Sequence, residues 1–193
     1  MKICVFGAAS PTIDKEYIQQ VEILGEELAK RGHSLVFGGG GNGLMGAVAR
    51  GVRAQNGYIL GIVPEFFEDE DIEKLYHDCD ERIETKTMRE RKQTMEDNAD
   101  AFIIVPGGIG TFEEFFEILT LRQLCRHTKP IAIYNVLNYY DEILTALDAA
   151  TEKGFIRGGC KDLVFTTKDV GALFDYIEAP PKEIKSVKEL KDG

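Results

Sequence analysis

The segment at residues 106–114 combines an anion-binding pattern with a carboxylate. It reads Pro-Gly-Gly-Ile-Gly-Thr-Phe-Glu-Glu, follows the apolar run at residues 101–105 and precedes a pattern with helical period. A helix N-terminus offers unpaired backbone N–H groups, and glycines let an anion approach them closely. We therefore predict a phosphate site at this turn. We also predict that Glu114 stands in the first helical turn, where the positive end of the helix dipole favours its ionised form.

Two of these residues also have a purely structural explanation. Thr111 and Glu114 have the spacing of a capping box, in which a threonine hydroxyl and a glutamate side chain bond N–H groups at a helix start. By themselves, the two residues favour that role. Phe112, Phe115 and Leu119 are expected to be core residues rather than ligand contacts.

A candidate cation lies on the preceding predicted helix, residues 87–98. Met88, Arg91 and Met95 are three and four positions apart, so they share one face, which the two methionines mark as apolar. An arginine pointing inward needs an anionic or multiply accepting partner, and either a carboxylate or a substrate phosphate would serve. The alternative is an arginine that extends from this face to water or forms a structural pair.

A second glycine cluster covers residues 38–41 and continues as Asn-Gly-Leu-Met-Gly at residues 42–46. It too follows a predicted strand and opens a helix. Ligands of open parallel sheets bind beyond the carboxyl ends of the strands, so both glycine loops should border one crevice. A tight turn with close helix packing explains the glycines equally well. A classical NAD site is not expected, because the first predicted strand is followed by Gly-Ala-Ala-Ser-Pro rather than GxGxxG.

Alternating strands and helices must position these loops. Short apolar runs predict strands at residues 3–6, 35–37, 58–63, 101–105 and 131–134, with a further one at 163–165. Helical periodicity predicts helices at residues 15–30, 44–55, 87–98, 111–124, 139–152 and 168–177. This alternation predicts an α/β fold: a single Rossmann-like, doubly wound parallel sheet with helices on both faces.

The expected domain covers residues 1–179, and residues 180–193 are expected to form a peripheral C-terminal tail. The acidic segment at residues 65–84 has few apolar positions with helical period, so we predict a long connection near the sheet edge.

Composition limits the classes of partner. The formal net charge of −10 argues against nucleic acid or an anionic membrane surface as the main partner, although a small phosphate ligand needs only local donors. Four scattered cysteines without a CxxC pair predict neither a metal site nor a disulfide framework. The N-terminal residues run directly into a predicted strand, and no apolar run reaches membrane-spanning length. A cytoplasmic protein is expected.

Together these segments resemble the LONELY GUY proteins, the cytokinin-activating nucleoside 5′-monophosphate phosphoribohydrolases that were long misnamed lysine decarboxylases. Residues 106–114 match the PGGxGTxxE signature of that family. Further matches lie at residues 37–41, 43–46, 88, 90–92, 100–102, 129–130, 138–140 and 154–156. The resemblance spans roughly residues 2–157.

The resemblance implies hydrolysis of the N-glycosidic bond of AMP or N6-prenylated AMP, giving free base and ribose 5-phosphate without a cofactor. It implies that Arg91 and Glu114 are the catalytic pair. A carboxylate beside the ribose can stabilise an oxocarbenium-like charge or orient water, whereas Arg91 would bind phosphate or hold Glu114. The substrate- and phosphate-binding residues are expected to be Met88, Lys92, Gly107, Gly108, Ile109, Gly110, Thr111, Glu113, Thr120, Gly39 and Gly40.

The chain departs from the family pattern at two positions. Ile109 stands where the family often has Tyr or Phe, and Arg89 stands where a His is common. These changes would alter base preference without touching the catalytic pair. A contact to the base from Glu73 is a further hypothesis, and the resemblance also implies a homodimer or a larger homo-oligomer.

Two other functions are alternatives for this sequence. One is a non-catalytic nucleotide-binding or cofactor-carrier protein of the same fold, which retention of the catalytic pair argues against. The other is a lysine decarboxylase, which would usually require pyridoxal phosphate and a Schiff-base lysine whose sequence context is not visible.

Overall fold

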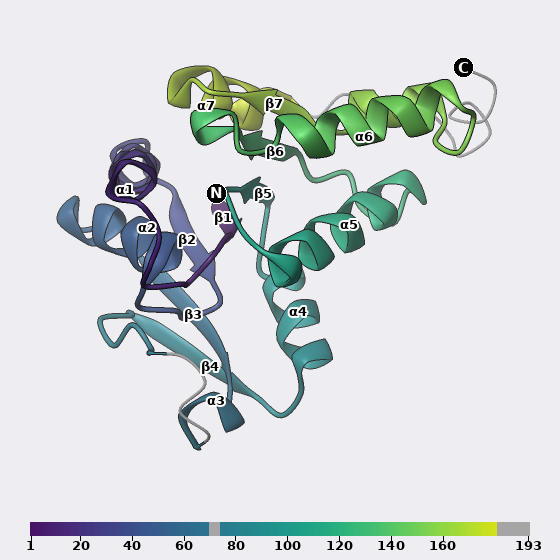
Figure 1. The fold of residues 1–193 in the computed structure, drawn as a ribbon. Helices are drawn as coiled ribbons and strands as arrows, with labels where there is room; N and C mark the ends of the chain where they lie inside the picture. Colours follow the sequence, from purple (N-terminus) through teal and green to yellow (C-terminus); the bar gives the residue numbers. More distant parts are fainter. Residues whose placement is uncertain (70–73, 181–193) are drawn as a thin grey trace.

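The computed structural model describes residues 1–69 and 74–180. Within them, seven strands form one parallel sheet in the order β4-β3-β2-β1-β5-β6-β7 (Figure 1). The strands are β1 (Lys2–Phe6), β2 (Ser34–Phe37), β3 (Ile59–Pro64), β4 (Glu81–Thr85), β5 (Ala101–Ile104), β6 (Ile131–Tyr134) and β7 (Phe165–Thr167). The predicted doubly wound α/β fold is confirmed.

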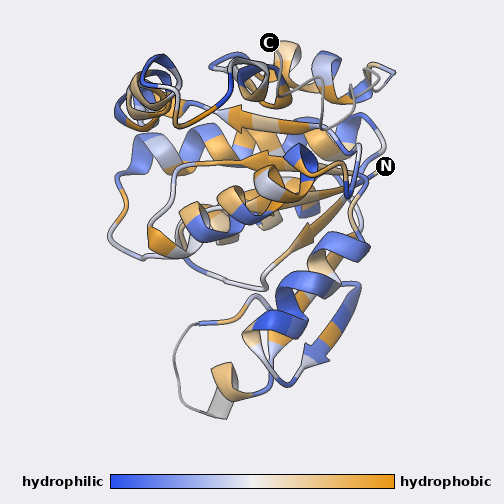
Figure 2. Ribbon diagram, turned by 90° about the vertical axis from the view of Figure 1, so that its right-hand side faces the viewer, coloured by the Kyte–Doolittle hydropathy of each residue, from blue (hydrophilic) through white to orange (hydrophobic). Residues whose placement is uncertain are grey.

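Helices cover both faces of the sheet, as predicted. On one face pack α1 (Lys15–Lys30), α2 (Gly43–Ala54) and α7 (Val170–Glu178); on the other pack α4 (Met88–Asp97), α5 (Ile109–Gln123) and α6 (Asp141–Glu152) (Figure 1). Each face has its own apolar cluster. Figure 2 shows the central strands in hydrophobic colours between helices that carry hydrophilic residues. Burial of both sheet faces explains why the central strands read as continuous apolar runs.

The connection predicted at residues 65–84 is wrong at its C-terminal end, because Glu81–Thr85 is the edge strand β4. This strand pairs in parallel with β3 alone. An edge strand tolerates charge, so its few apolar positions concealed it. The same segment contains the short helix α3 (Phe66–Asp69). The hypothetical base contact Glu73 lies outside the described residues.

The last strand is also displaced from its predicted position. The 3₁₀ helix η2 occupies Gly158–Leu163, so β7 begins at Phe165 rather than at residue 163. The predicted tail at residues 180–193 lies, apart from Pro180, outside the described residues. Among the described helices, none is both long and apolar enough to cross a membrane.

The chain reverses its direction of travel across the sheet at β1. From β1 it runs outward to β4 and then returns to place β5 on the other side of β1. The carboxyl ends of β1 and β5 therefore flank the topological switch point, where open α/β sheets bind ligands. The two predicted glycine loops follow β2 and β5, close to that point.

Candidate active site

A cavity of about 240 Å³ lies at the switch point. Its walls come from the loop after β1, from the second glycine cluster, from α4 and from the start of α5. Six of the predicted site residues line it: Arg91, Glu114, Gly108, Gly110, Thr111 and Gly40. The fold thus brings the predicted catalytic pair and the anion-binding turn to one place.

Arg91 is buried against backbone and an aromatic ring. It is 8% exposed, and its Nε and Nη2 each donate to a backbone carbonyl at 3.1 Å, those of Ile62 and Gly38. Its guanidinium carbon lies 5.4 Å from the ring centroid of Phe67. These contacts occupy two of the five N–H donors of the guanidinium and hold it in place.

The remaining side of Arg91 faces Glu114. Arg91 Nη1 lies 3.7 Å from Glu114 Oε1, which is an ion-pair separation rather than a hydrogen bond. The predicted inward orientation of Arg91 is confirmed, as is the burial of Met95. Met88, in contrast, is 40% exposed, so the buried face of α4 begins one turn later than the sequence pattern indicated.

Glu114 occupies a different helical position from the predicted one. Helix α5 begins at Ile109 with Gly108 as its N-cap, so Glu114 stands in the second turn. Burial raises the pKa of Glu114 to about 7, and Arg91 opposes that rise without cancelling it. The expected first-turn position and ready ionisation of Glu114 were therefore wrong, because desolvation dominates at this depth.

The capping box, which was the structural alternative for Thr111 and Glu114, does not form. No side chain caps the start of α5, and Thr111 is a buried residue of its first turn. Thr111 instead packs against Gly107, where an added Cβ would lie 2.1 Å from Thr111 Oγ1. A cap of this kind forms at α4, where Thr87 Oγ1 accepts the Glu90 N–H and Glu90 Oε2 accepts the Lys86 N–H.

With no side-chain cap, the first N–H groups of α5 are available to a ligand. At both Gly108 and Gly110 an added Cβ would meet no atom within 4 Å, so there is open space beside the helix start. An anion can therefore approach these N–H groups from the cavity.

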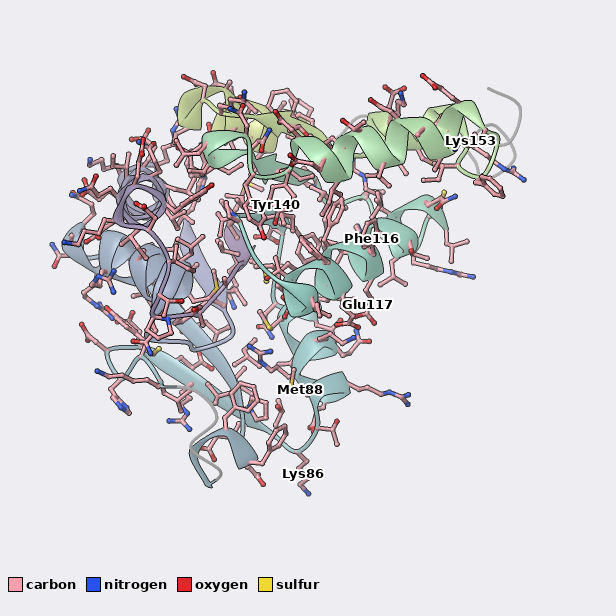
Figure 3. The ribbon with its side chains drawn as sticks, viewed as in Figure 1. Lys86, Met88, Phe116, Glu117, Tyr140 and Lys153 are labelled. Atoms are coloured by element: carbon pink, nitrogen blue, oxygen red, sulfur yellow. The ribbon has the colours of Figure 1, made fainter. Side chains whose placement is uncertain are left out.

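Several predicted substrate residues lie outside the lining of this cavity. Lys92 is held between Glu113 and Glu117 of α5, with 2.6 Å from its Nζ to Glu117 Oε2. Figure 3 shows Glu117 on the side of α5 toward α4. Ile109 is 87% exposed, and the Thr120 hydroxyl donates to the Phe116 carbonyl on the outer part of α5.

The predicted glycines divide between two cavities. Gly107 lines a neighbouring cavity of about 380 Å³, and Gly108 lines both. Gly39 has a φ of 81° and lies outside both linings, which fits a role in shaping the turn.

Sequence reasoning missed several residues of the cavity. Phe67 lies in the acidic connection, where only its place just after a strand end could have drawn attention to it. Ala8 and Ala9 follow β1 and lack a chemical signature. Met45 contributes apolar wall from α2. Among the described residues, no three His, Cys, Asp or Glu side chains gather as metal ligands.

Comparison with known proteins gives consistent matches. A family model described as "Possible lysine decarboxylase" matches residues 45–177. The chain is 36% identical over 177 residues to cytokinin riboside 5′-monophosphate phosphoribohydrolase LOG2 of Arabidopsis thaliana, which covers 92% of this chain and 82% of the relative. It is 40% identical over 154 residues to the cytokinin riboside 5′-monophosphate phosphoribohydrolase of Mycobacterium tuberculosis, covering 80% and 81%.

Solved structures share the fold at lower identity. The molybdenum cofactor binding protein of Rippkaea orientalis has a TM-score of 0.69 and 19% identity, covering 92% of this chain and 94% of that one. The molybdenum cofactor carrier protein of Chlamydomonas reinhardtii has a TM-score of 0.65 and 19% identity, covering 100% and 98%. At such identities the likeness concerns the fold alone.

Proposed function

Because the chain belongs to the family of cytokinin riboside 5′-monophosphate phosphoribohydrolases, we propose that it hydrolyses the N-glycosidic bond of nucleoside 5′-monophosphates. The products are free base and ribose 5-phosphate, and the substrates are AMP, N6-prenylated AMP or both. One observation carries the proposal: a largely buried carboxylate, that of Glu114, lies beside a fixed cation in the same cavity as an uncapped helix start.

The phosphate is assigned to the N-terminus of α5. The N–H groups that follow Gly108 supply donors, and the helix dipole favours negative charge there. The open space beside Gly108 and Gly110 supports this assignment. The ribose would then extend along the cavity toward Glu114.

Glu114 is assigned a catalytic role next to C1′ of the ribose, where the bond to the base breaks. As the C1′–N bond breaks, its electron pair leaves with the base, and positive charge develops on the ribose. An ionised Glu114 stabilises that charge and accepts a proton from the water that adds to C1′, while the departing base takes up a proton. A pKa near 7 suits such a base at neutral pH.

Arg91 is assigned to holding Glu114 rather than the phosphate. The 3.7 Å separation from Glu114 and the two bonds to backbone carbonyls support this choice. A guanidinium fixed by backbone keeps its charge beside the carboxylate and favours the ionised form of Glu114.

The two other functions are less well supported. A Schiff-base mechanism needs a lysine, and among the described residues that line the cavity there is none; Lys92 is paired with Glu113 and Glu117 on α5. The carrier function would rest on fold neighbours at 19% identity, whereas the phosphoribohydrolases are 36–40% identical. The absence of pyridoxal-phosphate absorbance from purified protein would dispose of the decarboxylase.

The decisive assay is chromatography of the products formed from AMP, GMP, CMP and N6-isopentenyl-AMP. Wild-type protein should release free base and ribose 5-phosphate from at least one of them. Glu114→Gln should retain binding and lose most turnover. Glu152→Gln, at an exposed position at the end of α6, is the control for charge. Release of no base from any nucleotide at high protein concentration would refute the proposal.

We further propose a cytoplasmic homodimer or larger homo-oligomer. Large apolar side chains are exposed on α5 and after α6, with Ile109 at 87%, Phe155 at 84% and Phe116 at 39% (Figure 3 labels Phe116). Association over α5 would bring Ile109, Glu113 and Thr120, which lie outside the cavity lining, next to a second copy. Sedimentation at micromolar concentration tests this, and a monomer would overturn it.

A further inference from the structure

In the loop that precedes α5, each backbone carbonyl from Val105 to Gly108 accepts a hydrogen bond. The Val105 carbonyl accepts the Tyr140 hydroxyl at 2.8 Å, and the Pro106 carbonyl accepts the Ala8 N–H at 3.0 Å. The next two accept from these groups: the Gly107 carbonyl from the Tyr139 hydroxyl at 2.7 Å, and the Gly108 carbonyl from the Phe112 N–H at 3.0 Å.

These bonds also orient the N–H groups of the loop. In a planar trans peptide the C=O of one residue points opposite to the N–H of the next. A donor on the Gly107 carbonyl therefore fixes the direction of the Gly108 N–H, which points away from Tyr139. Tyr139 and Gly107 line only the cavity of about 380 Å³, whereas Gly108 also lines the cavity of about 240 Å³ that holds Glu114. The Gly108 N–H points away from Tyr139 and belongs to a residue that lines both cavities, so it can serve a ligand in the cavity that holds Glu114.

The two tyrosines differ in what they can orient. Tyr140 holds the carbonyl of Val105, but the next residue is Pro106, which has no N–H. Its bond therefore secures the loop without presenting a donor to a ligand. Tyr139 holds the peptide that presents the Gly108 N–H.

The segment that carries the tyrosines is strongly constrained. Leu137 and Asn138 have φ values of 50° and 65°, in the left-handed region of backbone conformation that residues other than glycine rarely adopt. Asn135 is 3% exposed; its Oδ1 accepts the Tyr140 N–H at 2.8 Å and its Nδ2 donates to Asp141 Oδ1 at 2.7 Å. Figure 3 shows Tyr140 at the start of α6, close to the central strands.

We propose that Tyr139 is a positioning residue for the substrate phosphate, acting through the Gly107–Gly108 peptide that its hydroxyl holds in place. This inference rests on the proposed function for the presence of a phosphate at the start of α5. Tyr140 is the structural counterpart, which holds the adjacent Val105–Pro106 peptide without orienting a donor.

The test compares Tyr139→Phe with Tyr140→Phe, since each change removes one hydroxyl and keeps the ring. Tyr58→Phe is the matched control, because its hydroxyl bonds Glu81 on the surface, away from the loop. Calorimetric titration with ribose 5-phosphate measures affinity, steady-state kinetics with AMP separates KM from kcat, and thermal unfolding measures stability.

Tyr139→Phe should weaken ribose 5-phosphate binding and raise the KM for AMP by about three- to tenfold, the effect of one net hydrogen bond, with kcat within about twofold. Its melting temperature should change little, because Tyr139 is 39% exposed. Tyr140→Phe should lower the melting temperature by about 3 °C or more, since it leaves a buried carbonyl without its donor, and should keep the affinity within about twofold.

Failure of this inference is distinguishable from failure of the proposed function. If wild-type protein binds ribose 5-phosphate but releases no base, the hydrolase proposal fails, and the affinity comparison still decides the role of Tyr139. Equal loss of affinity in Tyr139→Phe and Tyr140→Phe would overturn that role, as would unchanged affinity in Tyr139→Phe. Wild-type protein that binds no ribose 5-phosphate would overturn it too.

Discussion

The substitution Glu114→Gln removes a carboxylate whose pKa is raised from 4.5 to about 7 by burial. In the unfolded chain this group loses its proton near pH 4.5, whereas in the fold it keeps the proton until about pH 7. The fold therefore binds more protons between these values, and wild-type stability falls as the pH rises through them. Glutamine does not ionise, so the stability of the variant lacks this decrease with pH.

The size of the effect follows from the shift. At 1.36 kcal/mol per pKa unit, the fully ionised carboxylate lowers the free energy of unfolding by about 3 kcal/mol. The sequence pI of about 4.9 makes pH 5.5 a practical lower limit for solubility. Between pH 5.5 and pH 8, wild-type protein should lose about 2 kcal/mol relative to Glu114→Gln. That corresponds to a relative shift of about 1 M in the urea midpoint.

Urea unfolding of both proteins at several pH values provides the measurement. The variant also leaves Arg91 without its carboxylate, and because arginine side chains do not titrate in this range, that cost is the same at every pH. Glu96, whose pKa burial also raises to about 7, is present in both proteins and cancels. Glu152→Gln controls for net charge. A difference between wild type and Glu114→Gln that stays constant within about 0.5 kcal/mol across the range would refute the reasoning.

Two further predictions concern the glycines. In Gly38→Ala the added Cβ would lie 1.7 Å from Arg91 Nη2, so the guanidinium should be displaced from the carbonyls of Gly38 and Ile62. AMP turnover should fall at least tenfold, and the free energy of unfolding should fall by about 2–4 kcal/mol because two buried carbonyls lose their donor. Wild-type turnover would contradict this. The melting temperature of Gly107→Ala should be several degrees below that of wild type, because the added Cβ would collide with Thr111. The melting temperature of Gly110→Ala should equal or exceed that of wild type, because the added Cβ enters open space at a helical position, where alanine is favoured over glycine. Equal melting temperatures for Gly107→Ala and Gly110→Ala would refute that contrast.

The pH dependence of kcat also tests the role of Glu114. The ionised carboxylate is the form that stabilises a positively charged ribose, so kcat for AMP should rise as the pH increases through about 7. A kcat that falls over this interval would indicate that Glu114 acts in its protonated form instead.

The elements of the fold that have a strong sequence pattern could be predicted from the sequence. Buried central strands such as β5 are continuous apolar runs, and the alternation with helices predicts parallel pairing. The turn at residues 106–114 could be recognised because its glycines, its strand and its helix are adjacent in the chain. Arg91 could be placed inward because the position of a residue on a helix face follows from its spacing.

Other features depend on contacts that the sequence does not reveal. The edge strand β4 lacks an apolar pattern because it has one neighbour. The depth of Glu114, and hence its raised pKa, depends on α5 packing against the sheet and on a helix start two residues before the predicted one. Phe67 reaches Arg91 from a segment whose acidic composition suggested only a connection.

The central position of β1 has a consequence for the order in which the site forms during synthesis. Both carbonyls that hold Arg91, those of Gly38 and Ile62, precede it in the chain, as does Phe67. Glu114 follows it and is buried only after β5 has paired with β1, a pairing that joins residue 3 to residue 101 and is therefore slow. In a nascent chain, Arg91 can thus reach its final position first, and Glu114 can pack beside it afterwards. Until β5 arrives, β1 is an unpaired sheet edge, so the interval before the site is complete is also when the chain is most exposed to misassociation.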